Sequence, residues 1–270
     1  MSAGWLWTPE GFSPCDSAPL TDRGFRYGMS VFESFPVRKK SPLFLQQHLQ
    51  RLESAAATAA FPTVLPSSEE IKKLLRDENR DGFARIYVTA GDGDVSLPAG
   101  RCRVFVFVEP RAPNAASVYE RGYRLTRHPN PHAPLFGGLK TANYWANIAA
   151  LQAARKQNFD EALLFSSDSL LSACMANVFV VRDGKITTPA LAGGTRDGVV
   201  RAWVAQRRSA EECNICDEDL KNADEIFLTS SWLGVMPVAS LDTRALPSRT
   251  TASALRGEYE NETGGAFSGE

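Results

Sequence analysis

The residue that could carry the most chemistry in this sequence is Lys140. It follows Gly137-Gly138-Leu139 at the end of a loop, directly before a helical pattern that runs from about Thr141 to Lys156. An amine at the end of a polar loop can reach a carbonyl compound and form a Schiff base with it. This pattern alone leaves a surface lysine as the alternative, because seven other lysines occur in the chain.

Two further features could bind a phosphate group. Arg51, in the run His48-Leu-Gln-Arg-Leu52, offers a planar guanidinium whose N–H groups match phosphate oxygens. The turn Gly198-Val199-Val200 leads into a helix, where backbone N–H groups and the helix dipole favour an anion. A surface arginine on an amphipathic helix and an ordinary loop are the respective alternatives.

Composition and charge exclude several classes of function. The chain has 270 residues, a net charge of −1 and no block of Lys and Arg, so we expect neither nucleic acid nor an anionic membrane as partner. No apolar run is long enough to span a bilayer, and the N-terminus does not resemble a signal peptide, which predicts a cytoplasmic protein. The five cysteines include one CxxC, Cys213 to Cys216, and the three histidines offer it no obvious second ligand pair. We therefore predict no metal site.

The order of elements predicts a mixed α/β (α+β) fold with two domains. The best linker candidate is 110–117, which places an N-terminal α/β domain at 1–114 and a C-terminal domain at 115–270. Within this frame we expect a helix at 46–60 and a second helix that begins with the cap Ser67-Ser68-Glu69-Glu70. We also expect one strand over 171–181, and a mobile tail from Arg244 onward.

At this point the chain resembles a known family, the fold-type IV enzymes that depend on pyridoxal 5'-phosphate (PLP), also called class IV aminotransferases. The family includes branched-chain and D-amino-acid aminotransferases and 4-amino-4-deoxychorismate lyase. Any one of the motifs that carry the resemblance is weak, but together they follow the family order over most of the chain. These motifs are Asp22-Arg-Gly-Phe-Arg-Tyr-Gly-Met-Ser-Val-Phe-Glu-Ser34, His48-Leu-Gln-Arg-Leu52, Lys140-Thr-Ala-Asn-Tyr144, Asp160-Glu-Ala-Leu-Leu164, Ala176-Asn-Val-Phe-Val180, Gly198-Val-Val-Arg201 and Ala223-Asp-Glu-Ile-Phe227.

The resemblance implies a cofactor and a set of residues that hold it. Lys140 would bind PLP as a Schiff base and then move the proton that the substrate carbon loses. The phosphate would lie on Arg51, on the turn 198–200 and on the hydroxyl of Ser231. Tyr144, one helical turn past Lys140 in the predicted helix, could reach the ring hydroxyl. The family also implies that the cofactor binds in the cleft between the two domains of a homodimer, with a small amino compound as substrate.

One position departs from the family pattern. The family has a glutamate five residues before the asparagine of its Asn-x-Phe strand, and that glutamate pairs with the pyridine nitrogen of PLP. Here the position holds Ser172, in Leu171-Ser-Ala-Cys-Met-Ala-Asn177. A hydroxyl has no formal charge, so we expect the ring nitrogen beside Ser172 to be mostly neutral and a weaker electron sink.

The sequence leaves three functions open. Thr229-Ser-Ser-Trp-Leu-Gly-Val-Met-Pro-Val238 looks more like the aminodeoxychorismate lyases, which release pyruvate and 4-aminobenzoate. The loop Ala90–Val95 lacks the arginine that such lyases use for substrate carboxylates, and Arg85 or Arg101 would have to replace it. A D-amino-acid or branched-chain aminotransferase is the second candidate. A PLP-binding protein with weak catalysis, caused by Ser172, is the third.

Overall fold

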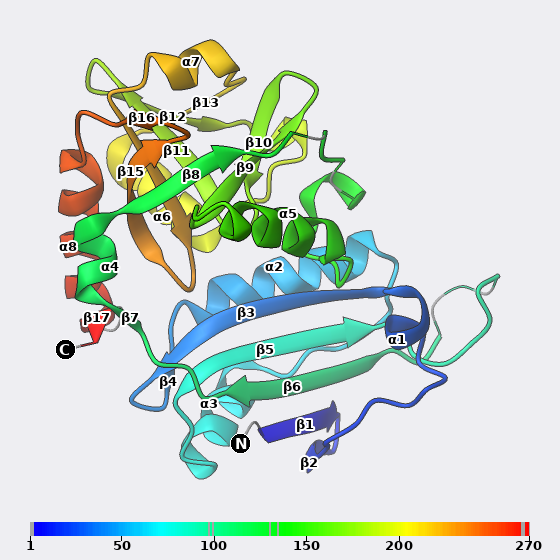
Figure 1. Cartoon of the computed structure of the whole chain (residues 1–270). Coiled ribbons are helices and arrows are strands. Elements are labelled where there is room, and N and C mark those ends of the chain that lie inside the picture. Colours follow the sequence, from blue (N-terminus) through cyan, green and yellow to red (C-terminus); the bar gives the residue numbers. More distant parts are fainter. Residues whose placement is uncertain are drawn as a thin grey trace. The chain divides into compact units, whose positions relative to one another are not determined.

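The computed structural model of the chain describes residues 3–96, 98, 100–129, 131–133, 135–265 and 268–269. The chain forms two compact units (Figure 1). Unit 1 consists of residues 1–112 together with 139–143, and unit 2 of residues 113–138 together with 144–270. Each unit combines a sheet with helices, so the predicted α/β class and its two-domain arrangement are confirmed. No helix within the described ranges is long and apolar enough to cross a membrane.

Unit 1 is built on a six-stranded antiparallel sheet in the order β2-β1-β6-β5-β3-β4. Two of its helices, α2 and α3, cover one face of this sheet (Figure 1). The elements are β1 (Ala3–Thr8), β2 (Gly11–Pro14), α1 (Arg23–Tyr27), β3 (Ser30–Arg38), β4 (Ser41–Pro42), α2 (Leu45–Thr58), α3 (Ser68–Asp77), β5 (Gly82–Thr89) and β6 (Arg103–Glu109).

The core of unit 1 follows from a period of two in the strands. In β6, Val104, Val106 and Val108 are buried, whereas the residues between them are half-buried. Side chains of alternate strand residues point to the same face, so the three valines share the core with Leu49 and Leu52 of α2. Aromatic side chains occupy the other face. This division leaves one face of the sheet available for function.

Unit 2 contains a nine-stranded mixed sheet in the order β10-β9-β8-β15-β14-β11-β12-β13, with β16 beside β15, and a two-stranded pair of β17 and β7. Its apolar core lies mainly on β11, β14 and β15. The elements are β7 (Asn114–Ala115), α4 (Ala116–Arg121), β8 (Tyr123–Arg127), η1 (Leu135–Gly138), α5 (Trp145–Lys156), β9 (Glu161–Ser166), β10 (Ser169–Ala173), β11 (Asn177–Arg182), β12 (Lys185–Pro189), η2 (Leu191–Gly193), α6 (Val199–Arg208), β13 (Glu211–Cys213), α7 (Asp217–Lys221), β14 (Glu225–Ser230), β15 (Gly234–Leu241), β16 (Arg244–Ala245), α8 (Thr250–Thr263) and β17 (Ser268–Gly269).

The segment 139–143 differs from its prediction as the start of a helix, because α5 begins only at Trp145. Its backbone pairs with the edge of β3: the N–H of Phe32 donates to the carbonyl of Lys140 at 2.8 Å, and the N–H of Ala142 donates to the carbonyl of Ser30 at 3.0 Å. Backbone groups that bond to a strand edge cannot also bond along a helix. Lys140 therefore belongs to unit 1, although the sequence had placed it in a C-terminal domain of residues 115–270.

The strand predicted over 171–181 is two strands, β10 and β11, joined by a turn at Cys174–Ala176. The buried carboxylate of Glu161 accepts hydrogen bonds from the backbone N–H groups of Cys174 and Met175, both at 3.1 Å. A turn whose N–H groups point at one carboxylate cannot extend a ladder. Ser172 and Asn177 thus lie on different strands.

The predicted mobile tail is wrong for most of its length, because it contains the fourteen-residue helix α8. Residues 266, 267 and 270 lie outside the described residues. Glu225, at the start of β14 and only 1% exposed, accepts hydrogen bonds from the N–H groups of Thr251 at 3.0 Å and Ala252 at 2.6 Å. A carboxylate at a helix N-terminus satisfies N–H groups that the helix itself leaves without partners.

We predict that Glu225→Ala lowers the free energy of unfolding by about 2–3 kcal/mol, because it removes charge-assisted hydrogen bonds and leaves buried N–H groups without an acceptor. Chemical denaturation of the variant and the wild type measures this difference. The control is Glu258→Ala, which removes the half-exposed partner of Arg208 on α8 and should cost less than about 1 kcal/mol. Equal losses in the two variants would show that Glu225 does not anchor α8.

Candidate active site

The side chain of Lys140 lies over an aromatic ring of unit 1. Its Nζ atom is 4.3 Å from the centroid of the Phe32 ring. Phe32 stacks on Tyr87 with centroids 4.8 Å apart, and Tyr87 stacks on Phe107 at 5.8 Å. A ring face attracts a cation, so this row of rings provides a favourable place for the amine in its charged form.

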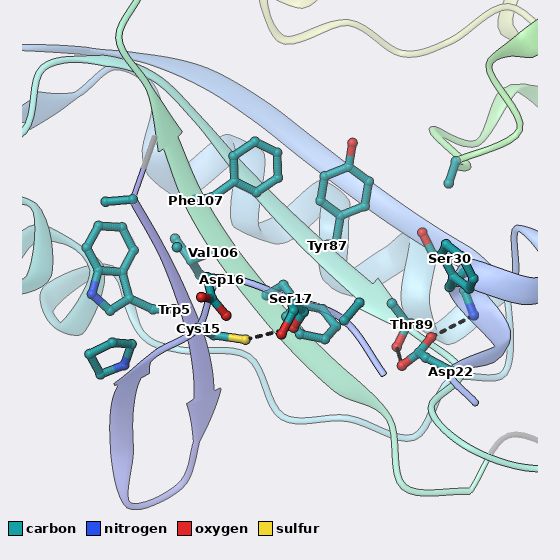
Figure 2. A pocket seen from close by; sticks show the side chains of 18 of the residues that line it. Trp5, Cys15, Asp16, Ser17, Asp22, Ser30, Tyr87, Thr89, Val106 and Phe107 are labelled. Atoms are coloured by element: carbon teal, nitrogen blue, oxygen red, sulfur yellow. Dashed lines mark hydrogen bonds between the residues drawn. The ribbon is translucent and has the colours of Figure 1, made fainter. Parts of the chain in front are cut away.

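A pocket of about 880 Å³ lies against the same face of the unit 1 sheet. Figure 2 shows the rings of Tyr87 and Phe107 next to each other on this face. At the other end of the view lie Ser30 and Thr89, where Thr89 donates a hydrogen bond of 2.8 Å to Asp22. Ala142, two residues after Lys140, also lines the pocket. The pocket combines apolar walls with a polar end, as small-molecule sites do.

Arg51 is paired with a carboxylate that the sequence analysis did not single out. Its Nε and Nη2 atoms donate to the two oxygens of Glu33, each at 2.7 Å, and Nδ1 of His48 lies 2.7 Å from Glu33 Oε2. Glu33 and His48 are 1% exposed, and the Arg51 side chain is 22% exposed. The spacing of His48 and Arg51, three residues apart on α2, puts both on one helical face toward β3.

Charge and burial act in opposite directions in this cluster. Burial alone would raise the pKa of Glu33, but the charge of Arg51 and the hydrogen bonds from His48 and Arg51 outweigh it and hold that pKa well below its usual range. Burial lowers the pKa of His48, and the charges of Arg51 and Lys140 lower it further against the opposing effect of Glu33. The cluster therefore consists of an ionised carboxylate, a guanidinium and a neutral imidazole that donates through Nδ1.

Unit 2 contains the predicted turn at the start of a helix. Gly198 is the N-cap residue of α6, as expected, and Val199 and Val200 form its first turn. A Cβ on Gly198 would lie 2.1 Å from Oδ1 of Asn177, so a side chain at this position would collide with Asn177. Asn177 is paired across the sheet with Thr229 of β14. The start of α6 is thus in close contact with β11.

One buried hydroxyl beside this turn shows that the residues fit a bound polar group. Oγ1 of Thr229 is buried and has no hydrogen-bond partner among the described residues. A buried polar atom without a partner is costly, and a phosphate or an ordered water would satisfy it. The first N–H groups of α6 are likewise available to an anion because a helix cannot pair them internally. Together with the lysine and the arginine of unit 1, this donor set suits a cofactor that carries a phosphate and a carbonyl.

The three remaining predicted residues lie in unit 2. Tyr144 is the N-cap residue of α5, so it is not one helical turn past Lys140 as the sequence suggested. Its ring lies under the guanidinium of Arg196, 5.4 Å from the ring centroid. Ser172 lies in β10 at an irregularity in the pairing with β9, and Ser231 follows β14 in the turn before β15. The structure therefore places Lys140 and Arg51 in unit 1, and Tyr144, the turn 198–200, Ser172 and Ser231 in unit 2.

Sequence reasoning missed Glu33, His48, Asn177 and Thr229 as parts of this arrangement. The signal for Glu33 was present, since it is a lone acidic residue in the apolar run of β3. Of the two arginines considered for a substrate carboxylate, Arg85 pairs with Glu109 at 3.1 Å, and Arg101 is exposed in the loop between β5 and β6.

Comparisons with known proteins agree with this arrangement. The sequence profile of the amino-transferase class IV family matches residues 30–241. A putative branched-chain-amino-acid aminotransferase of Methanocaldococcus jannaschii is 27% identical over 238 residues, which cover 83% of each chain. The solved 4-amino-4-deoxychorismate lyase from Pseudomonas aeruginosa superposes with a TM-score of 0.86 at 25% identity, covering 96% of this chain and 98% of the other. A solved branched-chain amino acid aminotransferase with pyridoxamine 5'-phosphate, from the organism abbreviated T.th., gives 0.84 at 25% identity, covering 97% and 94%.

The lowered pKa of Glu33 predicts how stability depends on pH. The folded protein keeps this carboxylate ionised where the unfolded chain, with a pKa near 4.5, takes up a proton. The group therefore contributes stability above pH 4.5 and loses it as the pH falls. Between pH 6 and pH 3 we expect the wild type to lose about 2 kcal/mol more of its unfolding free energy than Glu33→Gln loses.

Urea denaturation of both proteins at several pH values measures this difference. Glu53→Gln, which changes an exposed glutamate of α2, should follow the wild type. Parallel curves for the wild type and Glu33→Gln would contradict the assignment of Glu33 as a buried, ionised group.

Proposed function

Because this chain belongs to the aminotransferase class IV family and is a PLP-dependent enzyme, we propose that it is a 4-amino-4-deoxychorismate lyase that releases pyruvate and 4-aminobenzoate. Lys140 holds the cofactor in this proposal. Arg51, the N–H groups at the start of α6 and the hydroxyl of Ser231 bind its phosphate, and Tyr144 contacts its ring hydroxyl. Each of these groups has the charge or the hydrogen-bonding capacity that its role requires.

The observation that carries the choice of reaction is Ser172. A serine lies on β10 at the position where the family has a carboxylate for the pyridine nitrogen. A carboxylate would keep that nitrogen protonated and make the ring a strong electron sink, which a hydroxyl does not do. Elimination from an aminodeoxychorismate is driven by formation of an aromatic ring, so it depends less on that sink than amino transfer does. Similarity to the Pseudomonas lyase supports the same choice.

The residues of the chain then perform the following steps. When bound, PLP withdraws electrons from the substrate carbon that carries the amino group and makes its proton acidic. Lys140, released when the substrate amine takes its place, removes that proton as a general base. The electron pair left behind completes the aromatic ring as the C–O bond to the three-carbon group breaks, and the departing enolate takes up a proton to become pyruvate. The Phe32 ring, 4.3 Å from Nζ, stabilises the charge that Lys140 acquires.

An aminotransferase for branched-chain or D-amino acids is the second candidate. The similarity to a putative branched-chain-amino-acid aminotransferase over 83% of the chain favours it. The stacked rings of Phe32, Tyr87 and Phe107 would also suit an apolar substrate side chain. For either reaction, a small amino substrate, a homodimer and a cytoplasmic location are the expectations that follow from the sequence.

The products distinguish the two candidates. With 4-amino-4-deoxychorismate, the purified protein should release pyruvate and 4-aminobenzoate in equal amounts, measured by coupled lactate dehydrogenase and by fluorescence. Lys140→Ala should lose both the visible absorbance of the bound cofactor and at least about 1,000-fold in rate, because it removes the group that holds the cofactor and the base. Amino transfer from D-alanine or leucine to a keto acid, with no pyruvate from the chorismate derivative, would overturn the lyase in favour of the aminotransferase.

The role of Ser172 can be tested by restoring a carboxylate. We expect Ser172→Glu to raise amino transfer from D-alanine or leucine to a keto acid by about tenfold, since a protonated ring nitrogen stabilises charge on the substrate carbon. Ser169→Glu, on the same strand three residues earlier, is the matched control and should not change this rate. If the two variants behave alike while both retain the cofactor, Ser172 does not face the pyridine nitrogen.

A further inference from the structure

Glu33 has no role in the mechanism above, although it contacts one of the proposed phosphate ligands. Three hydrogen bonds of 2.7 Å reach its carboxylate: Arg51 Nε to Oε1, Arg51 Nη2 to Oε2, and His48 Nδ1 to Oε2. A guanidinium that forms two parallel bonds to a carboxylate keeps a single orientation of its plane. The Nε–Nη2 edge of Arg51 therefore faces Glu33, and a phosphate would meet the guanidinium on its Nη1 side.

Stability alone does not account for this cluster. Removing a carboxylate from water is expensive, and buried ion pairs are often no more stable than apolar side chains of the same volume. Glu33 lies in β3 between Phe32 and Ser34, at a position where an apolar residue would join the core around Phe35 and Leu49. The neutral His48 adds a third bond to the carboxylate and no charge. What the three residues provide is a fixed direction for the guanidinium.

β3 also fixes the position of Lys140. The N–H of Phe32 donates to the carbonyl of Lys140 at 2.8 Å, and Phe32 is the residue next to Glu33. Two consecutive residues of one strand thus set the backbone of the lysine and the plane of the arginine. PLP must be held at its carbonyl carbon and at its phosphate at the same time, so the relative placement of these two groups determines how well it fits.

We propose that Glu33 is a positioning residue that aims Arg51 at the phosphate of the cofactor, and that His48 holds Glu33 in place for this purpose. The inference rests on the proposed function, in which Lys140 binds PLP and Arg51 binds its phosphate. Glu33 contacts neither the cofactor nor the substrate in this arrangement. Its effect reaches the cofactor only through Arg51.

The experiment compares PLP with pyridoxal, which has the same carbonyl but no phosphate. Full-length wild type and Glu33→Gln are reconstituted with each compound, and the visible absorbance of the compound bound at Lys140 gives the dissociation constant. We expect Glu33→Gln to bind PLP about ten- to a hundredfold more weakly, and to bind pyridoxal within about twofold of the wild type. Glu109→Gln, which removes the carboxylate partner of Arg85 on the same sheet, should bind both compounds as the wild type does.

Other outcomes have definite meanings. Equal weakening for PLP and pyridoxal would reduce Glu33 to a structural residue and overturn the proposal. Tighter PLP binding by Glu33→Gln would show that Glu33 only neutralises Arg51, which overturns it as well. If the wild type itself binds no PLP at Lys140, the proposed function fails and takes this inference with it. Wild-type binding with an unaffected Glu33→Gln removes the inference alone.

A second pair of variants keeps the proposal testable if Glu33→Gln does not fold. His48→Leu removes the third bond to the carboxylate but leaves the pair of Glu33 and Arg51, whereas His48→Asn can place an amide N–H near the position of Nδ1. We expect His48→Leu to weaken PLP binding more than pyridoxal binding, and His48→Asn to restore the wild-type preference for PLP. A loss that His48→Asn does not restore, or one that is the same for both compounds, would contradict the positioning role.

Discussion

The arrangement of the candidate site depends on a short stretch of backbone pairing between residues 139–143 and the edge of β3. Val31 and Thr141 form a bridge, and hydrogen bonds flank it on both sides, from Phe32 to Lys140 and from Ala142 to Ser30. These bonds involve only main-chain groups, so they hold the lysine backbone whatever the side chain does. They also keep Lys140 out of α5. A lysine on that helix would be solvated on its surface, whereas this one lies over the ring of Phe32.

Buried carboxylates organise both units in the same way. Glu33 accepts bonds from Arg51 and His48, Glu161 accepts them from the backbone of the turn after β10, and Glu225 accepts them from the first turn of α8. A buried carboxylate must find several donors, and the donors in turn lose their freedom. Each of the three thus fixes a segment that a purely apolar contact would leave free to slide. Glu33 is the one whose donor is itself a proposed ligand of the cofactor.

The chemistry expected of this enzyme depends on what its residues omit as well as on what they supply. The lysine, the arginine and the helix N-terminus are those of a general PLP site and would serve either elimination or amino transfer. Ser172 is the residue that separates the two, because a hydroxyl leaves the ring nitrogen a weaker electron sink than a carboxylate does. A substrate that gains aromaticity by losing its side chain needs that sink least.

The parts of this protein that short-range patterns determine could be predicted from the sequence alone. The cap Ser67–Glu70 opens α3 as expected, and α6 begins directly after Gly198, because each signal acts on backbone groups within a few residues. The order of the motifs also established the family. The pairing of residues 139–143 with β3, the contact of Glu33 with Arg51 and the capping of α8 by Glu225 were decided only by the tertiary structure. In each, the partners are far apart in the chain, and their meeting depends on which strand edges and buried charges the rest of the fold leaves to be satisfied.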